Sequence, residues 1–373
     1  METDINLKNH TIKLPAIHFS IAGSNSLRMK NILIFFSLVF ILSCSNETEY
    51  VRVNEPLVFE QPSNFPALAY DLEANPPTEI GFELGKKLFY DGDLSRVGFI
   101  SCGFCHEQKD AFTHHGHQFS HGADDLEGTR NTPSIQNMAY MTHFMWDGAI
   151  NHLDLFPIAP ITNEVEMDES ITNVLAKLAA NSEYQKLFSE AFVDGEVNME
   201  NFLKALSQFM VMMVSSNSKY DKYVRNEDGI TLTSEELQGL AIFETNCATC
   251  HATDLFTDKS FRNNGLAPNS KLDDLGRYLV TGLEADKYKF KVPSLRNVAL
   301  TEPYMHDGRF GSLEAVLDFY TDGIIASPTL DSALQDNGVL GISLSSADKA
   351  ALVAFLNTLT DEEYIADERF AEF

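Results

Sequence analysis

Apolar residues recur at helical spacing along most of this chain. In the segment 78–95 they fall on one face of an amphipathic helix: Ile80, Leu84, Leu88 and Phe89. The segment 233–246 opens with a capping-box pattern, and apolar residues follow at helical spacing: Thr233 to Glu236, then Leu237, Leu240 and Ala241. Both segments are predicted to form helices.

Four more stretches have the helical period: 171–192, 198–216, 311–323 and 345–360. No run alternates long enough to predict a substantial strand. The cluster of Met210, Met212 and Met213 is interpreted as core packing in preference to iron ligands. The fold is therefore expected to be mainly α.

Composition narrows the function classes. A chain of 373 residues has room for two ordinary domains, and its 44% hydrophobic content is typical of a globular protein. The formal net charge of −27 argues against nucleic acid as a partner, because phosphates require basic surfaces. Acidic surface could equally serve a basic protein partner or the solubility of an exported protein.

The N-terminal region has the pattern of an export signal. Arg28 and Lys30 precede an apolar run at 32–42. This run is too short to span a bilayer but suits a signal peptide. We predict that translation starts at Met29, that residues 1–28 are a non-native upstream extension, and that 29–43 is a lipoprotein signal peptide. Ile-Leu-Ser-Cys resembles a lipobox, so Cys44 is predicted to be lipidated. The body would then be anchored to a membrane on its periplasmic side; a plain secreted protein is the alternative.

Four cysteines remain, in two Cys-x-x-Cys pairs that are each followed directly by histidine. The pairs are Cys102–Cys105 before His106 and Cys247–Cys250 before His251. A zinc site would not need the adjacent histidines, and a thiol redox site would not need two copies. Haem attachment needs all three residues of each motif, because the two thiols join the porphyrin and the histidine becomes the proximal iron ligand. We predict two covalently bound c-type haems.

Longer motifs carry a family resemblance. "GTRNTPSIQNMAY", "FMWDG" and "EVEM" in the first half, and residues 273–320 in the second, closely resemble the bacterial di-haem cytochrome c peroxidase and MauG family. The resemblance runs from about Pro76 to about Leu359 and implies two cytochrome c-like haem domains packed against each other. The expected division is a tether at 44–75, an N-terminal peroxidatic haem domain at 76–228, a C-terminal electron-transfer haem domain at 229–360, and an acidic, solvated tail at 361–373.

The same resemblance implies roles for individual residues. Glu166 falls at the family's catalytic acid–base position, and Pro160 matches a position near the peroxide pocket. Trp146, the single tryptophan, matches a residue placed between the haems. An inter-haem calcium site is implied for three positions: Asn131, Thr301 and Pro303. Hard oxygen donors of this kind suit Ca²⁺.

Two positions give conflicting hints about subtype. Fourteen residues after His306, where classical peroxidases carry methionine, this chain has Tyr320, as MauG-like members do. Tyr320 is the predicted sixth ligand of the second haem, with Met305 or water as rivals. His121, in a loop that also holds His114, His115 and His117, resembles the distal ligand of reductively gated members. A solvated histidine loop and a zinc site are the alternatives.

The resemblance implies an enzyme that reduces hydrogen peroxide to water with electrons from a small cytochrome c or other periplasmic donor. A MauG-like oxidase acting on a protein or small molecule through high-valent haem is one alternative. A non-enzymatic di-haem electron carrier is the other. Family members often dimerise, which makes a homodimer a further expectation.

Overall fold

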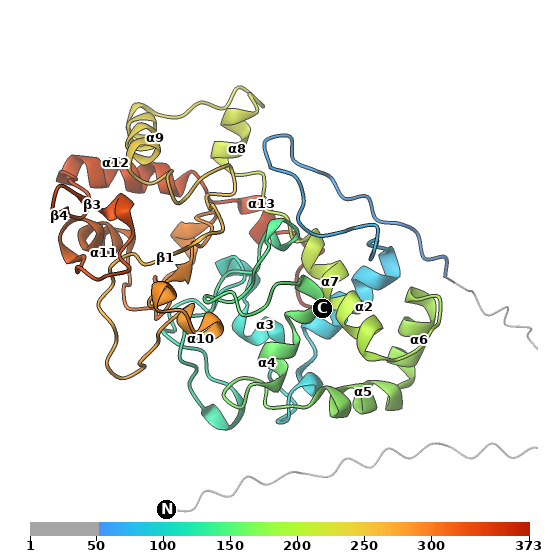
Figure 1. Ribbon diagram of the computed structural model, residues 1–373. Helices are drawn as coiled ribbons and strands as arrows, with labels where there is room; N and C mark the ends of the chain where they lie inside the picture. The colour runs from blue at the N-terminus through green and yellow to red at the C-terminus, as the bar shows by residue number, and fades with distance from the viewer. Residues whose placement is uncertain (1–51) are drawn as a thin grey trace, which may run out of the picture. The chain divides into compact units, whose positions relative to one another are not determined.

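Helices form most of the regular structure in the computed structural model, which describes residues 52–373 (Figure 1). The helices are α2 (Glu79–Phe89), α3 (Cys102–Cys105), α4 (Ile158–Thr162), α5 (Ile171–Ala180), α6 (Ser182–Ala191), α7 (Met199–Met212), α8 (Lys219–Val224), α9 (Ser234–Asn246), α10 (Tyr278–Thr281), α11 (Leu313–Asp318), α12 (Ser346–Asn357) and α13 (Glu362–Ile365). Short 3-10 turns lie at Gly92–Leu94, Gln108–Asp110, Ala123–Asp125, Met138–Tyr140, Leu153–Leu155, Glu284–Asp286, Val298–Leu300 and Ser332–Leu334. The mainly α prediction is confirmed.

Sheet structure is limited, within the described residues, to two antiparallel pairs of two-residue strands. β1 (Phe261–Arg262) pairs with β2 (Phe290–Lys291), and β3 (Gln335–Asp336) pairs with β4 (Val339–Leu340). The first pair matters for function, because it brings Lys291 to the wall of the main cavity described below.

The helix predicted at the start of the first half is α2. Thr78 caps it by accepting a hydrogen bond from the Gly81 amide, and all four predicted apolar positions are buried. The helix packs against α6 and α7 (Figure 1). A Cβ at Gly85 would collide with the Ala205 carbonyl oxygen of α7, so this glycine permits the close crossing of the two helices.

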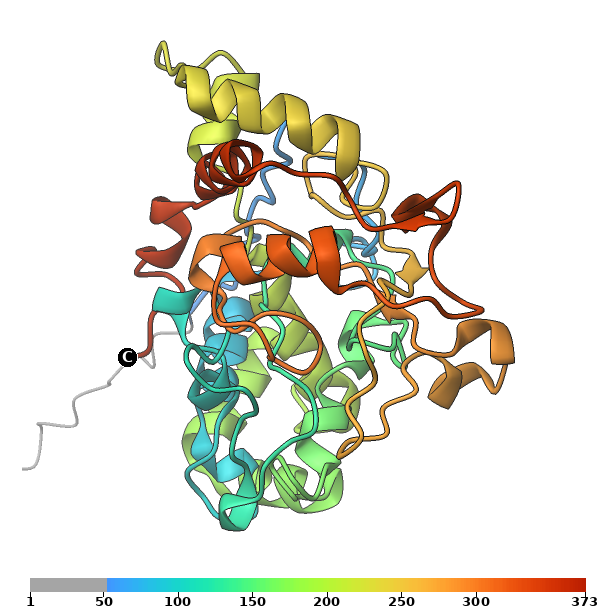
Figure 2. The ribbon, with the colours of Figure 1, turned by 90° about the vertical axis from the view of Figure 1, so that its left-hand side faces the viewer.

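The second half repeats this crossing with α9 and α12, which lie side by side in both ribbon views (Figures 1 and 2). The capping box of Thr233 and Glu236 is present as predicted. The expected apolar face is only partly right: Leu240 packs against the second core, but Leu237 is 42% exposed and the helix buries Gly239 and Phe243. A Cβ at Gly239 would collide with the carbonyl oxygen of Ala351 in α12, so close backbone approach sets the buried face.

Two of the other predicted helices are interrupted. The stretch 171–192 divides at Asn181, whose side chain accepts a hydrogen bond from the Glu183 amide and so starts α6 as a new helix. The stretch 311–323 forms α11 and then continues as a π-helical turn at Phe319–Gly323, which contains Tyr320. The methionines at 210, 212 and 213 belong to the first core, as predicted.

Hydrophobic residues form two main cores. The first is drawn largely from residues 65–213 and the second from residues 243–359. Tyr220 of α8 packs against the second core, on the rings of Phe256 and Phe355. The packing of the second half therefore includes residues before the predicted boundary at 228.

Both predicted flanking segments are more ordered than expected. The tail at 361–373 is not simply solvated, because Tyr364 and Phe370 are buried in the first core. In the described part of the predicted tether, Phe65 is buried against Tyr140, with 5.2 Å between the ring centroids. The acidic and proline-rich composition of these two segments predicted solvent exposure, and it outweighed the few apolar residues that pack into the core. Cys44 and the signal segment lie outside the described residues.

Candidate haem-binding and catalytic sites

The first Cys-x-x-Cys-His motif lies on α3, a single helical turn. Ser101 caps the turn by accepting a hydrogen bond from the Phe104 amide, and neither thiol forms a disulfide. Nδ1 of His106 lies 2.8 Å from the carbonyl oxygen of Phe112. Burial lowers the pKa of His106 to about 4. A neutral imidazole whose Nδ1–H is held by a carbonyl presents Nε2 to a metal.

The second motif repeats this arrangement. α9 ends at Asn246, and Nδ1 of His251 lies 3.0 Å from the carbonyl oxygen of Phe256. Burial lowers the pKa of His251 and raises that of the Cys247 thiol to about 12. Two reduced thiols beside an imidazole with a free Nε2 are the donor set that covalent haem requires. The residues present therefore fit a c-type haem in each half.

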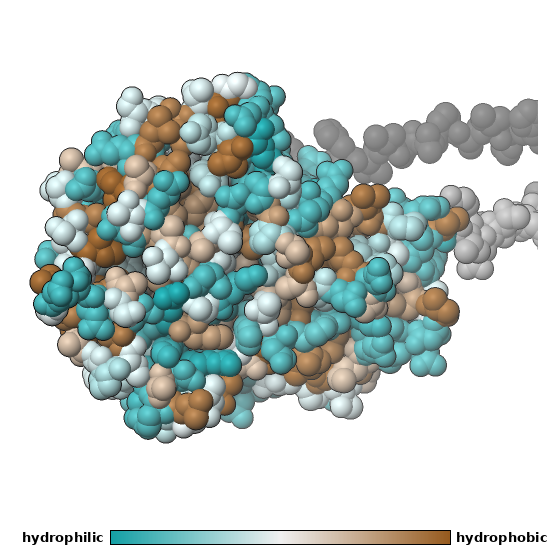
Figure 3. Space-filling view, turned by 45° about the horizontal axis from the view of Figure 1, so that its top comes forward, coloured by the Kyte–Doolittle hydropathy of each residue, from teal (hydrophilic) through white to brown (hydrophobic). Residues whose placement is uncertain are grey.

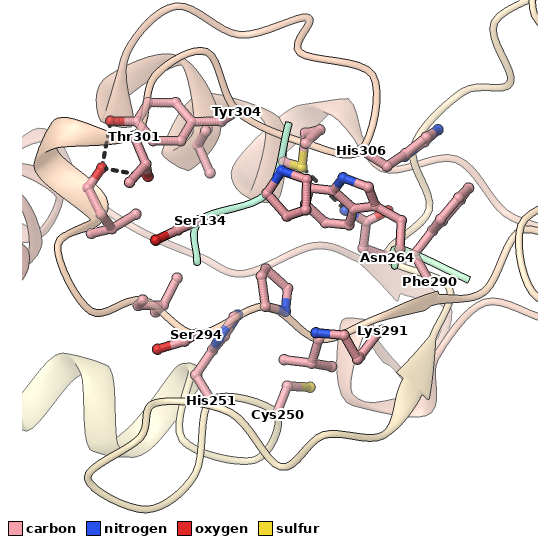
Figure 4. Close-up of a pocket in the computed structure, with 18 of the residues that line it drawn as sticks. Ser134, Cys250, His251, Asn264, Phe290, Lys291, Ser294, Thr301, Tyr304 and His306 are labelled. Atoms are coloured by element: carbon pink, nitrogen blue, oxygen red, sulfur yellow. Dashed lines mark hydrogen bonds between the residues drawn. The ribbon is translucent and has the colours of Figure 1, made fainter. Parts of the chain in front are cut away.

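A cavity of about 300 Å³ opens beside the second motif (Figure 4). Cys247, Cys250 and His251 line it, and so do Met305 and Tyr320, among mainly apolar side chains. His306 stacks on Phe290 at 3.7 Å between ring centroids. An apolar cavity bounded by a Cys-x-x-Cys-His motif and by further ligand-type side chains fits a porphyrin.

The rival sixth ligands share one partner. The side-chain amide of Asn264 lies 3.4 Å from the Tyr320 hydroxyl and 3.5 Å from the Met305 sulfur. Burial raises the pKa of Tyr320 to about 12, with added effect from Cys247 and Cys250. Tyr320 and Met305 thus both line this cavity and both contact Asn264, a residue that no sequence pattern singled out.

Glu166 lies near the first motif. Burial raises the pKa of Cys102 to about 12 and of Cys105 to about 11, and the negative charge of Glu166 contributes to both shifts. Burial also raises the pKa of Glu166, although the Asn163 amide donates to its Oε1 at 2.6 Å and opposes that shift. Pro160 lies in α4, just before this segment, and its carbonyl accepts the Met167 amide at 3.2 Å. A carboxyl that ionises less readily than usual therefore lies beside the first haem motif.

The histidine loop places different residues inside and outside. His121 is partly exposed, and its Nδ1 lies 2.9 Å from Asp125 Oδ1. His114 is buried, its Nδ1 lies 2.8 Å from the Ser120 hydroxyl, and its ring centroid lies 6.2 Å from that of Phe104, inside the first haem motif. His114 is thus the histidine of this loop with a direct link to the first haem motif. The sequence could not distinguish it within the cluster.

The loop that carries His121 nevertheless touches Glu166. The Ala123 amide donates to the Glu166 carbonyl at 2.7 Å, and Gly122 packs so closely on Glu166 that a Cβ would collide with it. The backbone of this loop is therefore in direct contact with that of the candidate acid–base residue.

Trp146 connects the two halves. Its indole N–H donates to the Asn131 carbonyl at 2.8 Å, and its own carbonyl accepts the Lys291 amide at 2.7 Å. The neighbouring Arg130 forms ion pairs with Asp147 at 2.6 Å and with Asp274 at 2.7 Å, across the same junction. The indole also lines the cavity, so it lies at the junction of the two halves; its place between two haems stays a prediction.

The three positions of the implied calcium site line that cavity as well: Asn131, Thr301 and Pro303. The Asn131 amide nitrogen donates to the carbonyls of His117 and Gln118, both at 3.2 Å, which leaves its Oδ1 available as a ligand. Within residues 52–373, no group of three or more His, Cys, Asp or Glu side chains is arranged to hold a metal ion. The histidine loop thus shows no zinc-type site, and a calcium ion here would depend on amide and carbonyl oxygens.

Comparison with known proteins decides the family. The family model described as di-haem cytochrome c peroxidase matches residues 79–229. The methylamine utilization protein MauG of Methylorubrum extorquens is 36% identical over 293 residues, covering 78% of this chain and 81% of that protein. The chain belongs to the di-haem cytochrome c peroxidase family. Its membership establishes the di-haem cytochrome c fold and, with it, two c-type haems as cofactors.

Other members of the family are similar over most of their length. Cytochrome c551 peroxidase of Nitrosomonas europaea is 31% identical, over 75% of this chain and 80% of that protein. The crystal structure of a MauG-like protein associated with microbial copper homeostasis matches with a TM-score of 0.75 at 33% identity, covering 84% of this chain and 99% of that one. The di-haem peroxidase of Burkholderia thailandensis matches with a TM-score of 0.68 at 22% identity, over 86% of this chain and 99% of that one, which supports the fold alone.

Proposed function

We propose that this di-haem protein reduces hydrogen peroxide to water with electrons from a small cytochrome c or another periplasmic donor. The observation that carries the proposal is the half-buried Glu166, whose raised pKa and proximity to the first haem motif suit a proton-transfer group. Relatives named cytochrome c peroxidase support the same reaction.

His106 and His251 hold the two irons, and the four motif cysteines attach the porphyrins. The bound haems supply the iron that takes up peroxide and the redox centres that carry electrons. The reaction consumes one hydrogen peroxide, two electrons and two protons and yields two waters. Glu166 accepts a proton from one peroxide oxygen and delivers it to the other, so that the O–O bond breaks with water as the leaving group.

Asn163 and Trp146 assist in this proposal. The Asn163 amide fixes one oxygen of the Glu166 carboxyl and leaves the other free to exchange a proton. Trp146, bonded to both halves, relays electrons between the two sites. Pro160 shapes the loop beside Glu166, where its carbonyl holds Met167.

The test replaces the carboxyl without changing its shape. Glu166→Gln in the haem-loaded protein should lower peroxide turnover with a reduced cytochrome by about 10²–10⁴-fold, the usual contribution of a positioned acid–base group. The exposed neighbour Glu164→Gln is the matched control and should keep wild-type turnover. Equal turnover of the Glu166→Gln and wild-type proteins would refute the acid–base role. No turnover by wild type in any redox state would leave an electron carrier.

A pH profile adds a second readout. Because burial raises the pKa of Glu166, the carboxylate form is lost at a higher pH than for an ordinary glutamate. The acid limb of the kcat/KM profile should therefore have its midpoint at a pH above the pKa of an exposed glutamate. This limb should disappear in Glu166→Gln. An acid limb that persists unchanged in the variant belongs to another group.

A MauG-like oxidase acting on a protein or small molecule is the second candidate. Tyr320, which lines the cavity beside the second haem motif, favours it. One equivalent of peroxide added to the fully oxidised protein should then change the Soret band at once. Tyr320→Phe should alter the spectrum of the second haem, whereas Met305→Leu should not. A response only after one haem is reduced would instead support a gated peroxidase, with His121 as the predicted distal ligand.

Location and assembly complete the proposal. We infer export to the periplasmic side with lipid attachment at Cys44; among residues 52–373, no helix is long and apolar enough to cross a membrane. A Cys44→Ser protein should lose incorporation of labelled fatty acid and appear in the soluble periplasmic fraction. Incorporation that continues in the variant would contradict lipidation at Cys44.

We also propose a calcium ion at Asn131, Thr301 and Pro303, and a homodimer. On the face shown in Figure 3, apolar residues lie in several separate groups among hydrophilic ones, so this view identifies no single docking face. Sedimentation of the haem-loaded protein over a range of concentrations would determine the oligomeric state. A single monomeric species at all concentrations would contradict the homodimer.

A further inference from the structure

Lys291 has a side chain that the proposed reaction does not use. It ends strand β2, and its backbone amide donates to the Trp146 carbonyl at 2.7 Å. The side chain lines the cavity beside Cys250 and His251, as Figure 4 shows. The strand pairing and the Trp146 contact therefore fix a lysine at the wall of the second haem site.

No partner for this ammonium is found in the part of the chain that the structure describes. No hydrogen bond or ion pair within residues 52–373 reaches Lys291 Nζ, whereas the nearby Lys287 and Lys289 pair with Glu284 at 2.8 Å and Asp286 at 3.5 Å. Burial alone lowers the pKa of Lys291 to about 8. A partly buried cation at the wall of an apolar cavity is costly without an anion, so an anion from outside the polypeptide would relieve that cost.

Other basic groups at this end of the cavity add to the positive charge. The Arg277 guanidinium donates to the carbonyls of Asp147 and Gly148, both at 2.8 Å, and lies over the Phe261 ring; it has no ion pair among residues 52–373. Burial lowers the pKa of His143, and the charges of Arg277 and Lys291 lower it further. His143 lines the same cavity.

A nearby arginine that has acidic partners shows the contrast. Arg262 forms ion pairs with Asp258 at 2.6 Å and with Asp331 at 3.0 Å. Positive charge is therefore in excess around Lys291, in a chain whose formal net charge is −27. A protein this acidic has many carboxylates available, yet none in the described residues 52–373 pairs with Lys291.

We propose that Lys291 supplies the counter-charge for a carboxylate of the haem attached at Cys247 and Cys250, and that it thereby holds the reduction potential of this haem up. Porphyrin carboxylates are the anions that a covalently attached haem brings into this cavity. The proposal rests on haem attachment at the second motif. It does not depend on whether the protein turns over peroxide.

The expected effect follows from charge. A cation beside a haem favours the ferrous form, which carries one positive charge fewer than the ferric form. Without Lys291, the haem carboxylate remains uncompensated and favours the ferric form. We expect the equilibrium between the two forms to shift about tenfold toward ferric iron, which is about 59 mV for a one-electron couple.

The experiment is a spectroelectrochemical titration of both haems in the wild-type protein and three variants. Lys291→Met removes the charge but keeps an unbranched chain, and Lys291→Arg keeps the charge. Lys289→Met is the control at a neighbouring, solvent-facing ion pair. In Lys291→Met, the ferrous–ferric equilibrium of one haem should shift about tenfold toward ferric iron. In Lys291→Arg and Lys289→Met, the same equilibrium should shift less than threefold.

Four results would overturn the proposal. In the first, neither haem's ferrous–ferric equilibrium shifts more than threefold in Lys291→Met. In the second, the equilibrium shifts as much in Lys291→Arg as in Lys291→Met. In the third, Lys291→Met changes the ligand-sensitive bands of a haem, which would make Lys291 an iron ligand. The haem content of each variant is measured as well, because a variant that fails to bind the second haem gives no reduction potential for it. Loss of the second haem in Lys291→Met alone would support a required charge, whereas loss in both Lys291 variants would indicate packing and overturn the proposal.

Discussion

Replacing Asp221 by alanine is expected to lower the free energy of unfolding by about 3–5 kcal/mol, the usual cost of leaving one partner of a buried ion pair uncompensated. Both oxygens of this carboxylate bond the Arg296 guanidinium at 2.7 Å, and both side chains are 0% exposed. Arg296 also donates to the Asp254 carbonyl at 2.7 Å and lies over the Phe65 ring. The variant would leave a guanidinium buried among these groups with no carboxylate.

The assay is urea unfolding followed by circular dichroism, on haem-loaded protein, as a double-mutant cycle of Asp221→Ala and Arg296→Met. The double variant should be more stable than the sum of the two single losses predicts, because it leaves no unpaired charge. Glu200→Ala, from the exposed pair with Lys204, is the control and should cost less than about 1 kcal/mol. Strictly additive losses in the cycle would refute the reasoning.

The pH dependence of the same cycle provides a sign test. Burial works against ionisation of Asp221, but the hydrogen bonds and charge of Arg296 outweigh it and lower the pKa of the carboxyl. Its contribution is therefore fully present above the unfolded pKa, about 3.9, and is lost as the pH falls through the lower folded value. The stability difference between wild type and Asp221→Ala should shrink in acid; a difference that grows below pH 4 would contradict this assignment.

Three further predictions concern packing and metal. Phe370→Ala should lower the free energy of unfolding by about 3–5 kcal/mol, because the ring is buried in the first core; a loss below 1 kcal/mol in urea would contradict that packing. Gly239→Val should destabilise the crossing of α9 and α12 by at least about 1–3 kcal/mol, since a Cβ meets the Ala351 carbonyl, while Gly311→Ala, which faces open space, is the control; equal melting temperatures for the two variants would refute the close approach. Removing calcium with a chelator should change the haem spectra reversibly, and Asn131→Ala should abolish that response; an identical response in the variant would place the ion elsewhere.

Much of the site could be predicted because the chemistry is local in sequence. Cys102, Cys105 and His106 must be adjacent for a thiol pair and an iron ligand to reach one haem, so the spacing itself carries the information. The same holds for the second motif. The amphipathic pattern of α2 was equally legible, since its buried positions are large and apolar.

The rest depends on contacts that periodicity does not record. The buried face of α9 is set by Gly239, and a glycine adds no hydrophobic signal. Asn264 connects to Tyr320 and Met305 only through tertiary structure, so its sequence neighbours gave no indication of its place. The lack of a partner for Lys291 within residues 52–373 also depends on tertiary structure, because it requires the positions of all the surrounding carboxylates.

The buried C-terminal segment has a consequence for the order of folding. Tyr90 of the first half donates its hydroxyl hydrogen to the Phe370 carbonyl at 2.6 Å, and Tyr364 donates to the Ile135 carbonyl at 2.6 Å. Domains generally fold as units, with the N-terminal one first during synthesis. Here the first haem half cannot complete its core until the last residues of the chain have emerged, so its final closure follows synthesis of the second half.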